Sequence, residues 1–303
     1  MITETMASLA KHVKKRIWIF SDLQLRKPEQ IRNILETAID DYRQLGLDCD
    51  QIWYLGDALI GADERELKQA AQVQTELLRS LNVPVRFVLG NHDNEYIRLQ
   101  EGGQKHIASF FHEAVKRVPG WRTTDTIETP YFTEDVGDFK VFFLSDHADL
   151  AGDWYTNGRI IGSEEKYPYQ ESFMSRLKEE MANAGKPVII ASHYSFAGGN
   201  RPSELWNRLL PLPDQAKVVF YGHSHIGDRH WGKEHVFRKI ACVEHQSIPQ
   251  LNVSSLENIR GDKIRSVYLE MYHDQTLGVY FRESERREWT EMLLLPMNLP
   301  ATR

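Results

Sequence analysis

Short apolar runs alternate with longer amphipathic segments over the first third of the chain. The strand-length apolar runs span residues 16–20, 51–55 and 85–89. Between the first two runs, residues 28–45 place apolar side chains at helical spacing, and Pro28 suits the first turn of a helix. Residues 67–81 repeat the helical pattern before the third run. This order predicts parallel strands connected by helices that pack on the sheet.

The rest of the chain is less regular, but it also contains apolar runs of strand length. Further strands are expected at residues 131–134, 140–144, 187–191, 217–221, 250–253, 266–271 and 277–281. A helix is expected at residues 171–184. We therefore predict an α/β fold, a four-layer α-β-β-α sandwich in which two facing mixed β-sheets are flanked by helices.

The same pattern predicts one large domain. Residues 1–15 lack the apolar centre of a signal peptide and form an N-terminal extension. Residues 16–282 form the domain, and residues 283–303 form a C-terminal tail, charged at first and then apolar. No apolar run approaches the roughly 20 residues that cross a bilayer, so no membrane partner is expected.

Composition narrows the class of protein. The 303 residues are 41% hydrophobic and 26% charged, as in ordinary globular proteins. The formal net charge of -6 disfavours a nucleic-acid partner, which usually requires a basic face. Two cysteines, Cys49 and Cys242, are too few for a disulfide framework. They are expected to be free thiols of a cytoplasmic protein.

Five short polar islands punctuate the chain, and four of them directly follow an apolar run. They are Asp22-Leu23-Gln24, Gly56-Asp57, Gly90-Asn91-His92-Asp93, Ser192-His193 and Gly222-His223-Ser224-His225. Ligands gather at the carboxyl ends of parallel strands, where loops carry side chains over the sheet edge. Each island alone is compatible with a turn or a helix cap. All five in order predict a two-metal site, because Asp, Asn and His bind divalent metals. A pair of such ions is suited to the cleavage of phosphate esters, which is the reaction we expect.

The islands resemble the motif set of the calcineurin-like metallophosphoesterases. That set is Asp-x-His, Gly-Asp, Gly-Asn-His-Asp/Glu, a lone His after a strand, and Gly-His-x-His, and four of its five parts match. The resemblance covers roughly residues 16–281. Residues 158–193 are most similar to the class III cyclic-nucleotide phosphodiesterase branch, which favours a phosphodiester substrate over a phosphomonoester.

The resemblance implies a role for each island. The implied ligands are Asp22 and His225 for a first metal ion, Asn91, His193 and His223 for a second, and Asp57 as the bridge. A hydroxide that bridges the ions is implied as the nucleophile. His92 is implied as the group that protonates the leaving oxygen. Asp93 is expected to orient His92 by accepting its other ring proton.

Gln24 is the departure from the family pattern, since this position usually holds His. Three readings are open: Gln24 binds the first ion through its amide oxygen, it acts through a water, or the first position is weak and fills only at high metal concentration. An amide oxygen favours hard ions over soft ones. We therefore predict two divalent ions, with Mn²⁺ favoured over Mg²⁺, Fe²⁺ or Zn²⁺.

The sequence thus predicts a dinuclear metal-dependent phosphoesterase that acts on a small phosphate ester. A non-catalytic metal-binding scaffold and a nuclease of the same fold are the alternatives. Gln24 favours the scaffold, whereas the retained ligands and His92 favour the enzyme. Asp146, His147, Trp154 and Arg201 are candidates for the rim of the pocket, although structural roles are favoured for them.

Overall fold

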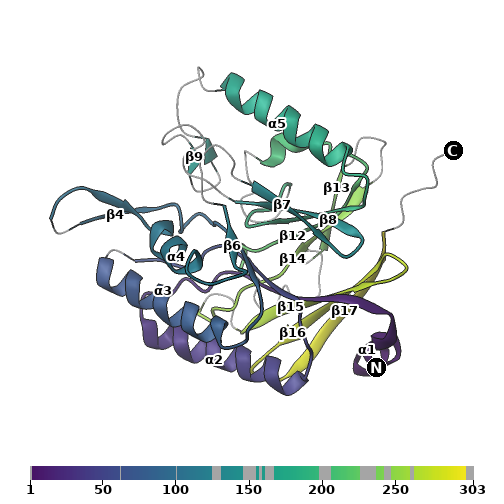
Figure 1. The fold of residues 1–303 in the computed structure, drawn as a ribbon, viewed down its shortest axis with the longest axis horizontal. Helices are drawn as coiled ribbons and strands as arrows, with labels where there is room; N and C mark the ends of the chain where they lie inside the picture. Colours follow the sequence, from purple (N-terminus) through teal and green to yellow (C-terminus); the bar gives the residue numbers. More distant parts are fainter. Residues whose placement is uncertain are drawn as a thin grey trace.

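A computed structural model describes most of the chain, and the fold is given for the described residues. They are residues 2–61, 63–99, 101–124, 131–145, 155–156, 159–160, 167–197, 206–225, 237–241, 247–259 and 263–297. Two large mixed sheets and five α-helices account for most of the regular structure among them (Figure 1).

The first sheet has seven strands in the order β17-β16-β15-β1-β2-β3-β6. Their bounds are Val13–Phe20 (β1), Gln51–Leu55 (β2), Val85–Val88 (β3), Arg122–Thr123 (β6), Arg265–Tyr272 (β15), Thr276–Glu283 (β16) and Glu288–Pro296 (β17). Strands β1, β2, β3 and β6 are parallel, whereas β15, β16 and β17 extend the sheet through antiparallel pairs.

The second sheet has six strands in the order β13-β14-β12-β11-β8-β7. Their bounds are Tyr131–Val136 (β7), Phe139–Leu144 (β8), Val188–Ser192 (β11), Ala216–Tyr221 (β12), Phe237–Ala241 (β13) and Ser247–Asn252 (β14). The four central strands are parallel, and β7 and β13 are antiparallel edges. Two short hairpins pair Tyr96–Arg98 (β4) with Gln104–His106 (β5), and Tyr155–Thr156 (β9) with Arg159–Ile160 (β10).

The helices begin and end at recognisable residues. They are Ile2–Leu9 (α1), Pro28–Leu45 (α2), Glu64–Arg79 (α3), Ala108–Val115 (α4) and Tyr167–Ala182 (α5), with 3-10 turns at Ala10–His12 (η1) and Trp206–Leu209 (η3). Helix α2 starts at Pro28 and ends before Gly46, whose φ of 60° suits glycine. Helix α3 is capped by the Asp63 carboxylate, which accepts the backbone N–H groups of Arg65 and Glu66.

Three apolar cores hold four layers together. Leu35 of α2 and Leu67 of α3 belong to the core on the outer face of the first sheet. Trp53 and Phe143 meet between the two sheets, with ring centroids 5.3 Å apart. Leu177 of α5 packs in the core on the outer face of the second sheet. Figure 1 shows α2 and α3 on one side of the molecule and α5 on the other. The predicted α-β-β-α sandwich is confirmed.

Several boundaries differ from those that the sequence predicted. Strand β1 begins at Val13 instead of residue 16, and β17 lies in the segment described from sequence as a tail. The proposed domain limits at residues 15 and 282 stay a prediction. Cys49 is a buried free thiol. Among the described helices, none has both the length and the apolarity that a bilayer crossing requires.

Candidate metal centre

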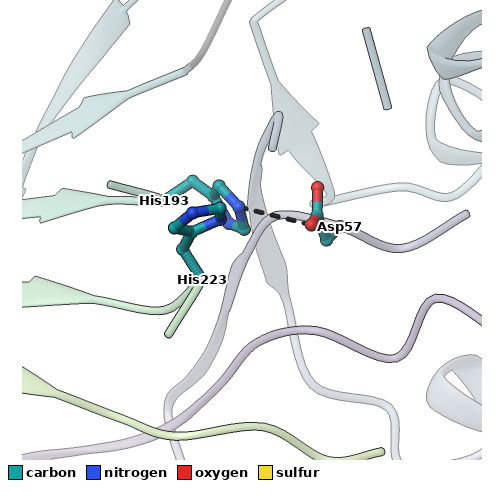
Figure 2. Close-up of side chains that lie close together, drawn as sticks. All are labelled: Asp57, His193 and His223. Atoms are coloured by element: carbon teal, nitrogen blue, oxygen red, sulfur yellow. Dashed lines mark ion pairs between the residues drawn. The ribbon is translucent and has the colours of Figure 1, made fainter. Parts of the chain in front are cut away.

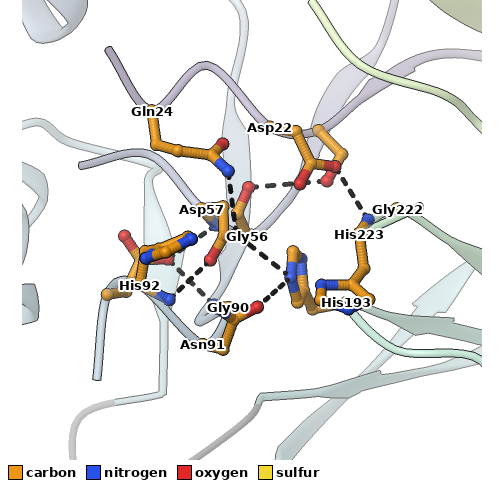
Figure 3. A network of polar contacts seen from close by, with 12 residues as sticks. Asp22, Gln24, Gly56, Asp57, Gly90, Asn91, His92, His193, Gly222 and His223 are labelled. Atoms are coloured by element: carbon orange, nitrogen blue, oxygen red, sulfur yellow. Dashed lines mark hydrogen bonds and ion pairs between the residues drawn. The ribbon is translucent and has the colours of Figure 1, made fainter. Parts of the chain in front are cut away.

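Strand ends from both sheets meet at one place and carry most of the predicted ligands. Asp22, Asp57, Asn91, His193 and His223 follow strands β1, β2, β3, β11 and β12, in that order. Backbone hydrogen bonds tie these ends together, from the Asp22 N–H to the Gly56 carbonyl and from the Gly222 N–H to the His193 carbonyl, both at 3.0 Å. Residues 201 positions apart in the chain therefore touch, as in the 2.8 Å bond from the His223 N–H to Asp22 Oδ2 (Figure 3).

The backbone of the predicted ligands is strained. Four of them have positive φ angles, which are 57° at Asp22, 54° at Asp57, 63° at His223 and 42° at His225. Residues other than glycine enter this region rarely, at a cost of about 1–2 kcal/mol each. Such strain persists only where the surrounding structure imposes it, and it concentrates at functional sites.

Asn91, His193 and His223, together with Asp57, form what we call the second group. One ligand atom from each of Asp57, His193 and His223 lies within 4.8 Å of the others (Figure 2). His193 Nε2 lies 3.4 Å from Asp57 Oδ2 and 3.1 Å from Asn91 Oδ1. Its Nδ1 donates to the Leu55 carbonyl at 2.8 Å, which fixes the ring so that Nε2 faces the other ligands.

Burial and neighbouring charges shift the pKa values of this group in different directions. Burial lowers the pKa of His193, but several contacts, of which the Asp57 carboxylate is the strongest, raise it to about 10. Burial and the charge of His193 lower the pKa of His223 to about 3. Burial raises the pKa of Asp57, yet the contact with His193 holds it below its ordinary value. Metal binding here would therefore displace a proton from His193.

Asp22, Gln24 and His225, also together with Asp57, form the first group. His225 Nε2 lies 3.1 Å from Asp22 Oδ1 and 3.3 Å from Gln24 Nε2. Gln24 Nε2 donates to Asp57 Oδ2 at 3.1 Å. Asp57 Oδ2 is thus the atom that both groups share.

His92 lies beside the two groups. Its backbone N–H donates to Asp57 Oδ1 at 2.8 Å (Figure 3). Its ring Nδ1 donates to Glu95 Oε1 at 2.8 Å. The prediction that Asp93 accepts this ring proton is therefore wrong, because Glu95 is the acceptor. Burial lowers the pKa of His92, but the contacts with Glu95 and Asp57 raise it above its ordinary value.

Asp93 instead holds two loops in place. Its carboxylate accepts four backbone N–H groups, from Asp57 (2.7 Å), Gly90 (2.8 Å), Ala58 (3.0 Å) and Leu59 (3.2 Å). These donors follow strands β2 and β3, so one side chain sets the spacing of the loops that carry predicted ligands. Burial and the charge of Asp57 raise the pKa of Asp93 to about 7.

One family model matches the chain over most of its length. The family model of calcineurin-like phosphoesterases matches residues 15–227, which is most of the chain and includes both ligand groups. The chain belongs to the calcineurin-like phosphoesterase family. The resemblance read from the polar islands is therefore confirmed. A search of curated proteins found no significant match.

Solved structures show the same fold at low sequence identity. A purple acid phosphatase, PPD1 from seeds of yellow lupin (Lupinus luteus), is 15% identical with a TM-score of 0.51, over 93% of this chain and 53% of its own. The chain thus spans about half of the lupin protein. A second structure is 10% identical with a TM-score of 0.51, over 94% of this chain and 99% of its own. A hypothetical protein of Pyrococcus horikoshii OT3 is 9% identical over 93% of this chain and 88% of its own, and its TM-score of 0.36 is too low to support an argument.

The residues present fit the divalent metal ions that this family implies. The second group offers a carboxylate, two imidazoles and the amide oxygen of Asn91, a donor set typical of divalent transition metals. The first group offers Asp22, His225 and an amide. Gln24 Oε1 is buried and has no hydrogen-bond partner among the described residues, so an oxygen donor is available there.

Gly90 has no room for a side chain, because a Cβ atom would lie 2.2 Å from Asp57 Oδ1 and 2.5 Å from Asp57 N. We expect Gly90→Ala to destabilise the fold by about 1–3 kcal/mol, as other overpacking substitutions do, and to weaken metal binding by displacing Asp57. Thermal unfolding and metal titration measure the two effects. Gly61→Ala is the control, since its Cβ would meet only the flexible end of Leu67 at 3.3 Å. Equal melting temperatures for the two variants would contradict the prediction.

Glu257 is a functional candidate that the sequence did not reveal. It is fully buried, and its Oε1 lies 2.8 Å from Nδ1 of His225. The backbone N–H of Glu257 donates to the Asp22 carbonyl at 3.0 Å, so this residue contacts two members of the first group. Its segment matches no part of the motif set, and a Glu some 30 residues beyond the last motif carries no signal of its own.

We expect Glu257→Gln to lower metal affinity by roughly 10- to 100-fold, because carboxylates behind a ligating histidine set its tautomer and basicity. Calorimetric titration with Mn²⁺ measures the change. Glu95→Gln is the matched control, since Glu95 contacts His92, which is not a predicted ligand. Equal losses in both variants would show that Glu257 has no particular link to the metal.

Four rim candidates are not tested by these contacts. Asp146, His147, Trp154 and Arg201 lie outside the described residues, as does Cys242.

Proposed function

We propose that the protein hydrolyses phosphate esters with two divalent metal ions, one at each ligand group. The ligands would be Asp22 and His225 for the first ion, with Gln24 beside them, Asn91, His193 and His223 for the second, and Asp57 for both. The observation that carries the proposal is the position of Asp57 Oδ2, 3.4 Å from His193 Nε2 and 3.1 Å from Gln24 Nε2. One charged oxygen shared by two ligand groups suits a pair of cations, because it offsets the charge of both.

The metal ions, His92 and Asp93 have different roles in the proposed reaction. Divalent ions supply Lewis acidity, which activates water and offsets charge on the phosphoryl oxygens. His92 would supply the proton that the leaving oxygen needs, and its contacts with Glu95 and Asp57 favour the protonated ring by raising its pKa. The His92 side chain is 22% exposed, so a substrate can reach it from solvent. Asp93 acts indirectly, by fixing the loop that carries His92.

The donor atoms of the site and the net charge of the chain support a preferred metal ion and a class of substrate. Position 24 lacks the imidazole that the family usually has, so the first group has fewer nitrogen donors, which favours Mn²⁺ over Zn²⁺ or Fe²⁺. The net charge of -6 supports a small phosphate ester over a nucleic acid. Similarity to the cyclic-nucleotide branch supports a diester over a monoester.

The test is hydrolysis of bis(p-nitrophenyl) phosphate and p-nitrophenyl phosphate by metal-stripped protein, with Mn²⁺, Mg²⁺, Zn²⁺ or Fe²⁺ added back. We expect turnover of the diester with Mn²⁺. His193→Ala is the control, since it removes a proposed ligand without touching His92. Turnover of the monoester alone would replace the diester in the proposal. Bound metal without turnover of either ester would contradict it and favour the scaffold.

A further inference from the structure

The Gln24 amide lies between the donors of the first group and is held there by its nitrogen. Gln24 Nε2 is 3.1 Å from Asp57 Oδ2 (Figure 3). It is also 3.3 Å from His225 Nε2. A carboxylate oxygen only accepts hydrogen bonds, so the amide atom that faces Asp57 is the NH₂ group. The side chain is 2% exposed, so this contact is shielded from water.

The NH₂ group uses a lone pair of Asp57 Oδ2 that a metal ion would need. Asp57 Oδ2 and His225 Nε2 are both proposed ligands of the first ion, and both face the same amide nitrogen. An NH₂ group has no lone pair to offer a cation, whereas the amide oxygen does. Gln24 Oε1, the atom that could bind, lacks a hydrogen-bond partner among the described residues.

The second group contains an amide in the opposite orientation. Asn91 turns its oxygen toward the group, with Oδ1 3.1 Å from His193 Nε2. The ligand atoms of Asp57, His193 and His223 lie within 4.8 Å of one another. An ion can enter this group without reorienting an amide, but an ion at the first group must first displace the Gln24 nitrogen.

We infer that Gln24 is a plug in the first metal position, so that the two positions fill in order, the second group before the first. This inference rests on the proposed function and adds a hierarchy to it. Displacing the amide breaks a hydrogen bond to a charged acceptor, which corresponds to an affinity on the order of 10- to 100-fold weaker at the first position. The protein would then hold one ion tightly and take up the other as metal concentration rises.

Binding of Mn²⁺ to metal-stripped protein tests the order, by calorimetry and by equilibrium dialysis with elemental analysis. We expect one tight and one weaker equivalent in the natural chain. Gln24→His supplies an imidazole and is expected to bring the two affinities within about tenfold of each other. Gln24→Ala separates a plug from a ligand, because removing a plug keeps or tightens the second equivalent, whereas removing a ligand weakens it. Thermal unfolding of both variants shows whether they are folded.

Two equivalents of indistinguishable affinity in the natural chain would overturn the inference, as would a weaker second equivalent in Gln24→Ala. Both results leave the proposed function standing, because it requires only that both positions be filled during turnover. Conversely, ordered filling without hydrolysis of either ester contradicts the proposed function and supports the plug. Protein that binds no Mn²⁺ at all would overturn both.

Discussion

Replacing Asp57 by Asn is expected to reduce hydrolysis of the test diester to the background rate of buffer with metal. Its Oδ2 atom contacts both ligand groups, so the substitution removes a charged ligand from each. Asn keeps the shape of Asp and tolerates the left-handed backbone at this position, where φ is 54°. Turnover at saturating Mn²⁺ and bound metal per chain measure the two consequences.

The fold is expected to survive this substitution. Asp57 is the main cause of the raised pKa of His193, so removing the carboxylate lowers this pKa and favours the neutral imidazole over a buried unpaired charge. Circular dichroism and the melting temperature of metal-stripped protein check this point. Asp41→Asn is a contrasting control, because it breaks a buried pair with Arg282 whose closest contact is 2.6 Å, and its cost falls on stability. An Asp57→Asn variant that retains most of its turnover would rule out the shared-oxygen arrangement.

Replacing His92 by Ala is expected to lower kcat by roughly 10²- to 10⁴-fold, the usual contribution of a positioned acid or base. The backbone N–H of residue 92 still donates to Asp57 Oδ1 in this variant, because that bond does not involve the imidazole. Metal content should therefore stay unchanged, which distinguishes loss of a proton donor from loss of a ligand. Turnover and elemental analysis on one preparation supply both numbers.

Glu95→Gln tests the role of His92 with a milder change, because it alters the partner of the imidazole and leaves the imidazole in place. It keeps a hydrogen-bond acceptor near Nδ1 of His92 but removes the charge that helps to raise the pKa of the ring. The loss of kcat should be smaller than in His92→Ala, and the alkaline limb of activity, where the ring loses its proton, should move to lower pH. If His92→Ala turns over normally at saturating metal, the imidazole has no part in leaving-group protonation.

The sandwich could be predicted from sequence because its strands are short apolar runs and its helices have a clear apolar stripe. Helix α2 begins at Pro28, as the pattern indicated. Strand β17 was missed because its side chains divide between two cores and solvent. Met292 packs on the helix side, Leu293 packs between the sheets, and Leu294 is 45% exposed. The sequence of this edge strand therefore lacks the simple alternation of buried and exposed residues that would have predicted it.

The sequence predicted which motifs form the site, but it did not predict which side chains contact one another there. The polar islands fall at strand ends, so their convergence follows from the parallel topology. The partner of His92 does not follow, because adjacent residues in a tight turn point in different directions, and Asp93 turns inward to four backbone N–H groups. Glu257 and the orientation of the Gln24 amide depend on neighbours that are distant in the chain.

The left-handed conformation of Asp22, Asp57, His223 and His225 sets a rule for reading mutational scans of this protein. At these positions the backbone itself ranks the twenty amino acids, with Gly, Asn and Asp tolerated and β-branched residues penalised. A saturation library would therefore show deep selection against Val, Ile and Thr even if none of these side chains met a metal ion. Only a comparison between residues that this backbone tolerates, such as Asp and Asn, shows whether the side chain takes part in metal binding or catalysis.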